Sequence, residues 1–244
     1  MTRQPLAGKR VVTTRDERGV VDRLLAEAGA EVVHVPLIKI VDAEDGGAQL
    51  QRLLQTIDDF EWLIVTSQHG ATRVGKAARN RGVRLAAVGT KTAGELAALA
   101  KRPVSVVPRV QTGAGLLAAM PYDGAGSKVL LAQADRAGTE LADDLRERGY
   151  DVTAVIAYRT TLRRPTAAEL RAALTADAVA FASGSAVQGW VDAIGYRTPR
   201  CVVAIGPSTA GFAQELGLRV THVAADHSVP GLVAEIVRAL GPSP

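Results

Sequence analysis

The residues of this sequence that are best suited to chemistry are hydroxyls and glycines that follow buried strand patterns. The apolar run from Cys201 to Ile205 ends in Gly206, and Pro207 then opens an Ala-rich helical pattern. We expect the first amides of that helix to lack a side-chain cap, so this corner is suited to binding an anion. A similar corner follows the apolar run that ends at Val88, with Gly89 at its turn.

Hydroxyl side chains recur at such corners along the whole chain. They are Thr66, Ser67, Thr92, Thr112, Ser183, Ser185, Ser208, Thr209 and Ser228. Taken singly, each is best interpreted as a helix N-cap, because that is the commonest use of Ser and Thr at such positions. Their recurrence on one edge of two similar domains favours a second interpretation, a surface rich in donors and poor in carboxylates. Such a surface fits a ligand that carries several anionic groups.

Short β-rich runs alternate with amphipathic helical patterns throughout the chain. The runs are almost continuously apolar, which is typical of parallel strands covered by helices on both faces. We therefore predict an α/β fold with doubly wound, flavodoxin-like parallel sheets. The predicted strands are Arg10–Thr14, Glu31–Val35, Trp62–Thr66, Leu85–Val88, Val104–Val107, Lys128–Ala132, Val152–Ile156, Asp177–Ala182, Cys201–Ile205 and Val220–Val223.

The two halves of the chain indicate an internal duplication. Val11 aligns with Val129 at an offset of 118 residues, and Ser67 aligns with Ser183 at an offset of 116. The segment Gly-x-x-Thr-Ala-Gly occurs at Gly89 and again at Gly206, 117 residues later. Any two doubly wound domains resemble one another, but these shared residues favour true repetition. We therefore expect five strands in each half, with the same four strand-to-helix corners at their carboxyl ends.

Composition and charge narrow the class of protein. The 244 residues carry a formal net charge of +4, but the Arg and Lys residues are scattered rather than clustered. Aromatic residues make up only 4% of the chain, which leaves few platforms for stacking bases. We therefore expect an acidic small molecule as ligand, and neither nucleic acid nor a membrane. The chain shows no secretory signal and no long apolar run, so we expect a cytoplasmic protein.

Motifs for metal, nucleotide or covalent chemistry do not stand out. The single cysteine, Cys201, lies in an apolar strand pattern and is interpreted as a buried hydrophobe. The four histidines show no metal-ligand spacing, and no phosphate-binding loop occurs. The run Gly113–Ala118 matches a dinucleotide fingerprint formally, but it begins well after its strand and is interpreted as a chance match.

Tyr158 marks a difference between the two halves. It stands after the second strand of the second half, where the first half has Ile38. A tyrosine in an extended segment is often a half-buried packing residue. The alternative is that the duplicated scaffold has gained a proton donor at the junction of its halves. The sequence leaves both interpretations open.

Eight parts of the sequence together carry a resemblance to a known family. They are Val11–Arg15, Leu25–Val32 with Pro36, Trp62–Gly70, Ala87–Ala93, Tyr158, Phe181–Val187, Ile205–Ala210 and Gly231–Val233. No single motif is specific, but their order and spacing across nearly the whole chain resemble the uroporphyrinogen-III synthase family of tetrapyrrole biosynthesis.

The resemblance implies two α/β domains joined by a two-stranded connection. Residues 1–37 with 162–244 would form one domain and residues 42–157 the other. Residues 38–41 and 158–161 would connect them, with Tyr158 facing the cleft between the domains. The first β-α-β unit would therefore join the C-terminal third of the chain, an exchange that the repeat pattern alone does not predict.

The resemblance also implies a reaction. The family cyclises hydroxymethylbilane, a linear tetrapyrrole with eight carboxylates, and inverts the last pyrrole ring through a spiro intermediate. Orientation of the substrate should then dominate catalysis, with Tyr158 as proton donor to the departing hydroxyl. Carboxylates would be held by Arg15, Thr66, Ser67, Gly89, Thr92, Thr112, Gly113, Arg136, Ser183, Ser185, Gly206, Ser208 and Thr209. The resemblance implies no cofactor and no metal.

A second function remains open at this point. A noncatalytic two-lobed sensor that binds a tetrapyrrole or another polyanion would show the same corners, although retention of Tyr158 favours the enzyme. We expect a monomer with a small-molecule substrate. Transfer of that substrate from the upstream bilane-forming enzyme is a further hypothesis.

Overall fold

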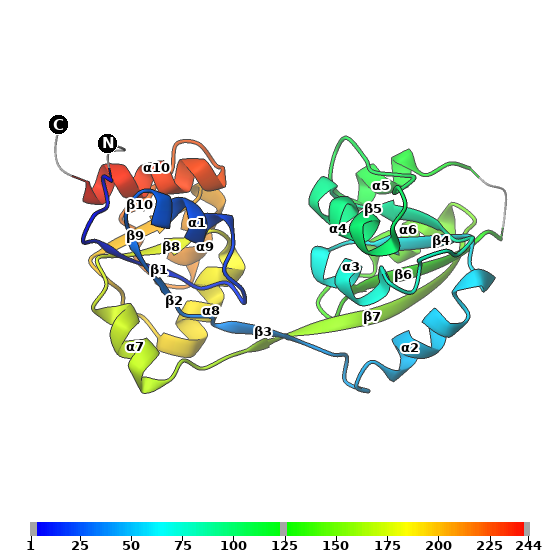
Figure 1. The fold of residues 1–244 in the computed structure, drawn as a ribbon, viewed down its shortest axis with the longest axis horizontal. Coiled ribbons are helices and arrows are strands. Elements are labelled where there is room, and N and C mark those ends of the chain that lie inside the picture. Colours follow the sequence, from blue (N-terminus) through cyan, green and yellow to red (C-terminus); the bar gives the residue numbers. More distant parts are fainter. Residues whose placement is uncertain (1–3, 123–125, 242–244) are drawn as a thin grey trace. The chain divides into compact units, whose positions relative to one another are not determined.

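The computed structural model describes residues 4–122 and 126–241, which fold into two compact units (Figure 1). Unit 1 comprises Met1–Lys39 and Thr161–Pro244, and unit 2 comprises Ile40–Thr160. The two ends of the chain thus fold together, and the middle of the chain forms the second unit. Each unit contains one five-stranded sheet.

The sheet of unit 1 has the strand order β10-β9-β8-β1-β2, and all of its pairings are parallel. Its order is the doubly wound one, because the chain starts in the middle of the sheet and later strands are added on the other side. The strands are β1 (Arg10–Thr13), β2 (Glu31–His34), β8 (Ala178–Phe181), β9 (Cys201–Ala204) and β10 (His222–Val223).

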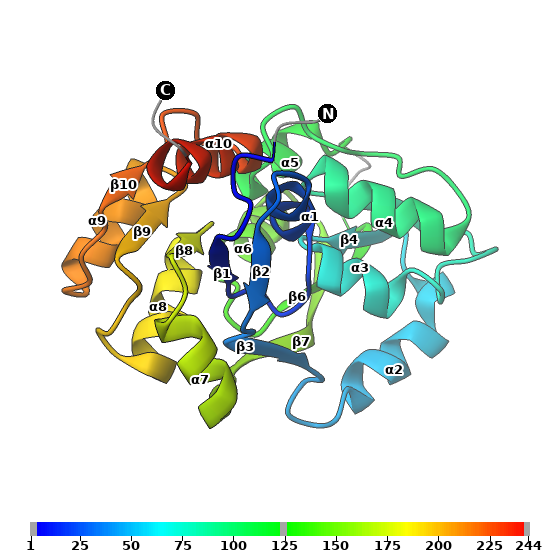
Figure 2. The same ribbon diagram turned by 60° about the vertical axis from the view of Figure 1, so that its left-hand side comes forward.

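Helices cover both faces of this sheet (Figure 2). Helices α1 (Val20–Glu27) and α10 (Val229–Leu240) pack on one face, where Val11 and Val203 are fully buried. Helices α7 (Ala167–Leu174), α8 (Gly184–Ile194) and α9 (Pro207–Glu215) pack on the other, around Phe181 and Trp190. Burial on both faces accounts for the continuously apolar strands.

The sheet of unit 2 has the order β3-β7-β6-β4-β5. Its strands are β3 (Ile38–Val41), β4 (Trp62–Val65), β5 (Arg84–Ala87), β6 (Lys128–Ala134) and β7 (Asp151–Leu162). One face is covered by α2 (Ala48–Gln55), α3 (Gln68–Val74) and α4 (Thr90–Ala100), with a 3-10 turn at Ile57–Asp59. The other face is covered by α5 (Gly113–Ala119) and α6 (Glu140–Glu147).

The strand registers of the two units agree with the predicted repeat. Val11 lies opposite Ala178 in unit 1, and Val129 lies opposite Trp62 in unit 2. These pairs are related by the offsets of 118 and 116 residues that align the two halves of the sequence. Each sheet therefore combines the first two strands of one half with later strands of the other half.

Two predicted elements differ in the structure. Residues 104–107 form only an isolated bridge, between Ala86 and Val106, rather than a strand. Pro103 and Pro108 flank this segment and have no amide hydrogen, which prevents a longer ladder. The other difference is β7, which continues to Leu162 rather than ending at Ile156 and so includes Tyr158.

Across residues 4–122 and 126–241, no helix combines the length and the apolar character that crossing a membrane requires.

Candidate active site

Several predicted site residues cap helices at the carboxyl edges of the two sheets. In each case the hydroxyl oxygen accepts a hydrogen bond from the backbone amide three residues later, at distances between 3.0 and 3.2 Å. These residues are Ser67 and Thr112 in unit 2, and Ser183 and Ser228 in unit 1. The N-cap interpretation is therefore correct for these four. A capping hydroxyl keeps its own hydrogen, but Ser228 already donates that hydrogen to the Asp226 carboxylate at 2.7 Å.

Helices α4 and α9 begin differently, because their N-cap residues are Gly89 and Gly206 and no cap residue side chain accepts a hydrogen bond. At α4 the side-chain oxygen of Gln111 accepts a hydrogen bond from the amide of Thr90 at 3.1 Å. At α9 the ring of His227 lies so close that a Cβ on Gly206 would be 3.1 Å from it. Gln111 and His227 are 116 residues apart, so they occupy equivalent positions in the repeat. Each covers the glycine corner of its unit.

The remaining hydroxyls are not equally accessible. Thr92 and Thr209 lie in the first turns of α4 and α9, and each is only 6% exposed. Ser185 and Ser208 are exposed, and Thr66 is half-buried. The accessible donor surface is therefore smaller than the sequence pattern suggested. The hydroxyl oxygens of Ser185 and Ser183 lie 2.9 Å apart, so these two donors form a pair.

The two predicted arginines, Arg15 and Arg136, are exposed and follow β1 in unit 1 and β6 in unit 2. The carbonyl oxygen of Arg15 lies 2.8 Å from Nε2 of His34. Beside Arg136, Asp135 is tied to the end of β7: its amide donates to the carbonyl of Tyr158 at 3.0 Å. The Asp135 carboxylate also accepts from the amide of Thr160 at 3.3 Å. The segment that carries Arg136 is thus anchored next to Tyr158.

A break in the register of β7 determines where Tyr158 points. Gln133 lies opposite Ile156, but the next residue, Ala134, lies opposite Tyr158, so Ala157 is an extra residue in β7. Side chains of a regular strand alternate between the two faces, and a bulge of one residue reverses that alternation. Val155, Ala157 and Tyr158 accordingly all join the core on the α3 side, whereas Ile156 is 43% exposed.

Tyr158 is 6% exposed and lies against α3. The ring of His69 contacts it edge-on, with ring centroids 5.5 Å apart. The guanidinium carbon of Arg73 lies 5.9 Å from the Tyr158 ring centroid, within the range of a cation–π interaction. His69 and Arg73 are four residues apart and therefore share one face of the helix. Among the described residues, the Tyr158 hydroxyl has no hydrogen-bond partner.

Arg73 is held from its other side by Asp42, which follows β3. Their side chains form an ion pair at 2.9 Å, with the arginine 22% and the aspartate 66% exposed. Nε of Arg159 donates to the carbonyl oxygen of Asp42 at 3.3 Å, which attaches this residue to β7 as well. Nε of Arg73 is buried and has no hydrogen-bond partner among the residues that the structure describes. A phenol is thus held beside a guanidinium that is itself only partly satisfied.

Two other kinds of reactive site were considered from the sequence, a cysteine nucleophile and a metal centre. Burial raises the pKa of the Cys201 thiol, which is consistent with the predicted role as a buried hydrophobe. No group of three or more His, Cys, Asp or Glu side chains in the described part of the chain is placed to hold a metal ion.

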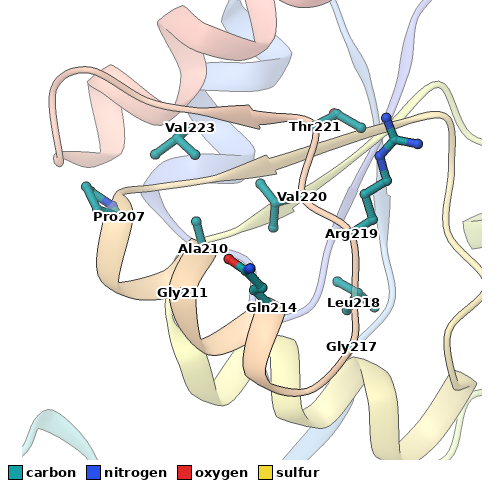
Figure 3. A pocket seen from close by; sticks show the side chains of 10 residues that line it. All are labelled: Pro207, Ala210, Gly211, Gln214, Gly217, Leu218, Arg219, Val220, Thr221 and Val223. Atoms are coloured by element: carbon teal, nitrogen blue, oxygen red, sulfur yellow. The ribbon is translucent and has the colours of Figure 1, made fainter.

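Unit 1 also contains an open apolar pocket of about 830 Å³ beside α9 (Figure 3). It is bounded by one face of α9 and by the segment from Gly217 to Val223. Ala210, Gln214 and Val220 face one another across it, and the guanidinium of Arg219 extends away from it. Its lining contains none of the predicted site residues, although Pro207 lies between Gly206 and Ser208 in the sequence.

Sequence reasoning proposed Tyr158 as a site residue but did not name the residues that surround it in the structure. His69 and Arg73 carried one available signal, their spacing of four residues in the segment that follows the predicted strand Trp62–Thr66. Asp42 carried no such signal, because it is separated from Tyr158 by more than a hundred residues. Gln111 and His227 could have been recognised from the repeat, since each directly precedes a residue predicted as a corner.

Comparisons with known proteins agree with the resemblance. The model of a family described as "Uroporphyrinogen-III synthase HemD" matches residues 20–234. The chain is 30% identical over 247 residues to "Uroporphyrinogen-III synthase, chloroplastic" from Oryza sativa subsp. japonica, covering 94% of this chain and 80% of that protein. It is 27% identical over 258 residues to "Uroporphyrinogen-III synthase" from Synechococcus elongatus, covering 97% of each.

A solved structure supports the fold. The crystal structure of uroporphyrinogen-III synthetase from Helicobacter pylori 26695 covers 95% of this chain and 99% of its own, with a TM-score of 0.64 and 16% identity.

Proposed function

The chain belongs to the uroporphyrinogen-III synthase family, and from this membership we propose that Tyr158 is its proton donor and that two glycine corners bind the substrate carboxylates. The family consists of cyclising lyases of porphyrin and haem biosynthesis. The relatives reported above carry the enzyme's name, and no observation on the structure favours the alternative of a noncatalytic sensor.

The substrate of the proposed reaction is hydroxymethylbilane. Its terminal hydroxyl must leave, and protonation of that oxygen makes it a better leaving group, so a neutral phenol is a suitable acid. The single observation that carries the assignment is the bulge in β7. It turns Tyr158 away from the face of Ile156 and places it against His69 and Arg73. Bulges that redirect a side chain are common beside active sites.

The carboxylates of the substrate are proposed to bind at the helix N-termini. Helix α9 begins at Gly206 without a side-chain cap, and exposed Ser208 adds a hydroxyl in its first turn. At α4, beside Gly89, a carboxylate would displace the neutral oxygen of Gln111 from the amide of Thr90. A charged acceptor is favoured there because the N-terminus of a helix carries partial positive charge.

The other proposed contacts follow from exposure. Arg15 and Arg136 contribute positive charge, and the remaining donors come from Thr66, Ser67, Thr112, Gly113, Ser183 and Ser185. Thr92 and Thr209 are buried, so we propose that they support the first turns of α4 and α9 rather than meet the substrate directly. The proposed reaction uses no cofactor.

The wider setting is also a proposal. Residues 38–41 and 158–161 are proposed to be the connection between the units. We propose that the protein acts as a monomer in the cytoplasm and receives its substrate from the enzyme that forms the bilane. The rice relative is named as chloroplastic, so the compartment is a separate question for each organism.

The test supplies hydroxymethylbilane and separates the porphyrin isomers after oxidation. We expect Tyr158→Phe to lower kcat about a hundredfold, since general acids typically contribute between about 10² and 10⁴ in rate. Tyr196→Phe is the matched control, because Tyr196 is 67% exposed in unit 1 and should leave kcat unchanged. A Tyr158→Phe protein with the parental rate and isomer ratio would exclude the assignment.

A further inference from the structure

The position of Arg73 lowers the stability of the fold, and its contacts offset little of that loss. Its Nε is buried and finds no hydrogen-bond partner in the described part of the chain, and a buried unpaired N–H destabilises a folded protein. Its partner Asp42 is 66% exposed, and ion pairs with exposed partners contribute little to stability. A buried polar group that is left unsatisfied in this way requires a separate explanation.

We infer that Arg73, oriented by Asp42, is a positioning residue for Tyr158 in the cyclisation. This inference rests on the proposed role of Tyr158 as proton donor. The geometry that supports it is a chain of three contacts. Asp42 bonds to Arg73 at 2.9 Å, Arg73 lies 5.9 Å from the centre of the Tyr158 ring, and Arg159, the neighbour of Tyr158, bonds back to Asp42.

The contacts limit how the phenol can turn. The edge of His69 contacts the Tyr158 ring at an interplanar angle of 65°, and the guanidinium lies near the same ring. The bulge at Ala157 fixes the backbone from which the ring projects. Arg73 is the charged member of this set, so it restricts the ring and also responds to charge that develops on it.

The chemical step explains why a cation is useful there. The O–H bond of Tyr158 breaks as its proton passes to the departing hydroxyl, and the C–O bond of the substrate breaks to release water. The phenol oxygen then carries a negative charge, which a nearby guanidinium stabilises. The proton that the last ring loses when the macrocycle closes restores the phenol. The proton count therefore balances over one turnover.

A competing role for Arg73 is direct binding of a substrate carboxylate. The two roles differ in what a substitution changes. Loss of a carboxylate ligand weakens substrate binding and raises KM, whereas loss of a group that acts on the proton donor lowers kcat. They also differ in their dependence on Tyr158, because only the positioning role disappears when the phenol is removed.

The experiment therefore places Arg73→Gln in the parental chain and in Tyr158→Phe, and measures kcat, KM and the isomer ratio with hydroxymethylbilane. We expect Arg73→Gln to lower kcat about tenfold in the parental chain, which is the effect of a partly desolvated cation–π contact. KM should change less than about twofold. In the Tyr158→Phe background, Arg73→Gln should have no further effect on kcat.

Three further variants separate an effect on the Tyr158 phenol from a general effect on folding or charge. Arg73→Lys should recover part of the lost kcat, because it restores charge without the planar guanidinium. Asp42→Asn leaves Arg73 in place but loosens it, and should lower kcat by a smaller factor. Asp42 is 66% exposed, so this substitution should not disturb folding. Arg81→Gln is the matched control, since it removes an exposed ion pair with Asp58 in the same unit and should leave kcat unchanged.

The possible failures are distinguishable. The inference is overturned if Arg73→Gln lowers kcat by the same factor with and without the Tyr158 hydroxyl, or if KM rises while kcat stays constant. A Tyr158→Phe protein with parental kcat instead removes the proposed function, and the positioning role with it. Thermal unfolding of every variant identifies losses of activity that arise from misfolding.

Discussion

A buried hydrogen bond in unit 1 offers a quantitative test of how the end of β1 is joined to helix α1. Thr13 and Asp22 are 3% and 5% exposed, and the Thr13 hydroxyl donates to the Asp22 carboxylate at 2.6 Å. The other carboxylate oxygen accepts from the amide of Gly19 at 2.7 Å, at the start of α1. Thr13→Val removes the hydroxyl while keeping the shape, so one buried carboxylate oxygen loses its partner.

The expected cost is about 2 kcal/mol, since hydrogen bonds to charged groups contribute roughly 1.5 to 3 kcal/mol. With a urea m-value of about 2 kcal/mol/M for a domain of this size, the unfolding midpoint of unit 1 should fall by about 1 M. Unit 2 contains neither residue and should not respond. Substitutions in separate units normally add independently.

The chain provides a separate reporter for each unit. Trp190 is fully buried in unit 1, and Trp62 is 1% exposed in unit 2. Fluorescence of a Trp62→Phe protein therefore follows unit 1, and that of a Trp190→Phe protein follows unit 2. Thr13→Val should lower the unfolding midpoint of unit 1 and leave that of unit 2 unchanged. An equal shift in both transitions, or a change below about 0.5 kcal/mol, would refute the reasoning.

Two further predictions use the same reporters. Gly115→Ala and Gly231→Ala should each destabilise their own unit by about 1 to 3 kcal/mol, because the added Cβ would lie 2.0 Å from the carbonyl oxygen of Val110 or Asp226. The urea midpoint of each variant measures this loss. If one variant unfolds at the parental midpoint and the other does not, the two corners are not equivalent. The hydrogen bond from Arg163 lowers the pKa of Glu169, so its stabilising effect is complete above the unfolded pKa of about 4.3 and is lost as the pH falls through the lower folded pKa. Glu169→Gln should therefore flatten the acid limb of unit 1 stability, and an unchanged acid limb would show that this pair contributes nothing.

Much of the fold could be predicted because its determinants are local. Parallel strands covered on both faces must be apolar throughout, and runs such as Trp62–Val65 show this directly. The exception, residues 104–107, is also local in origin: the apolar run suggested a strand, but its flanking prolines limit it to one bridge. Prolines at both ends of a short apolar run limit its strand pairing even where its side chains favour a strand.

The sequence predicted which residues form the glycine corners, but not how buried the residues around them are. Gly89 and Gly206 begin helices without a side-chain cap, as their sequence context indicated. The burial of Thr92 and Thr209 was not predictable, because the position of a first helical turn relative to its sheet depends on packing. The same holds for Gln111, which reaches the amide of Thr90 across 21 residues.

By itself, the sequence determined the alternation of strands and helices, the repeat and its offsets, and the glycine corners at Gly89 and Gly206, and it marked Tyr158 as a difference between the halves. These follow from residue type and spacing along the chain. Only the tertiary structure decided which face Tyr158 occupies and what surrounds it. The bulge at Ala157 needs a partner strand in order to exist, and Asp42, Arg73 and Tyr158 meet only after three distant segments have packed together.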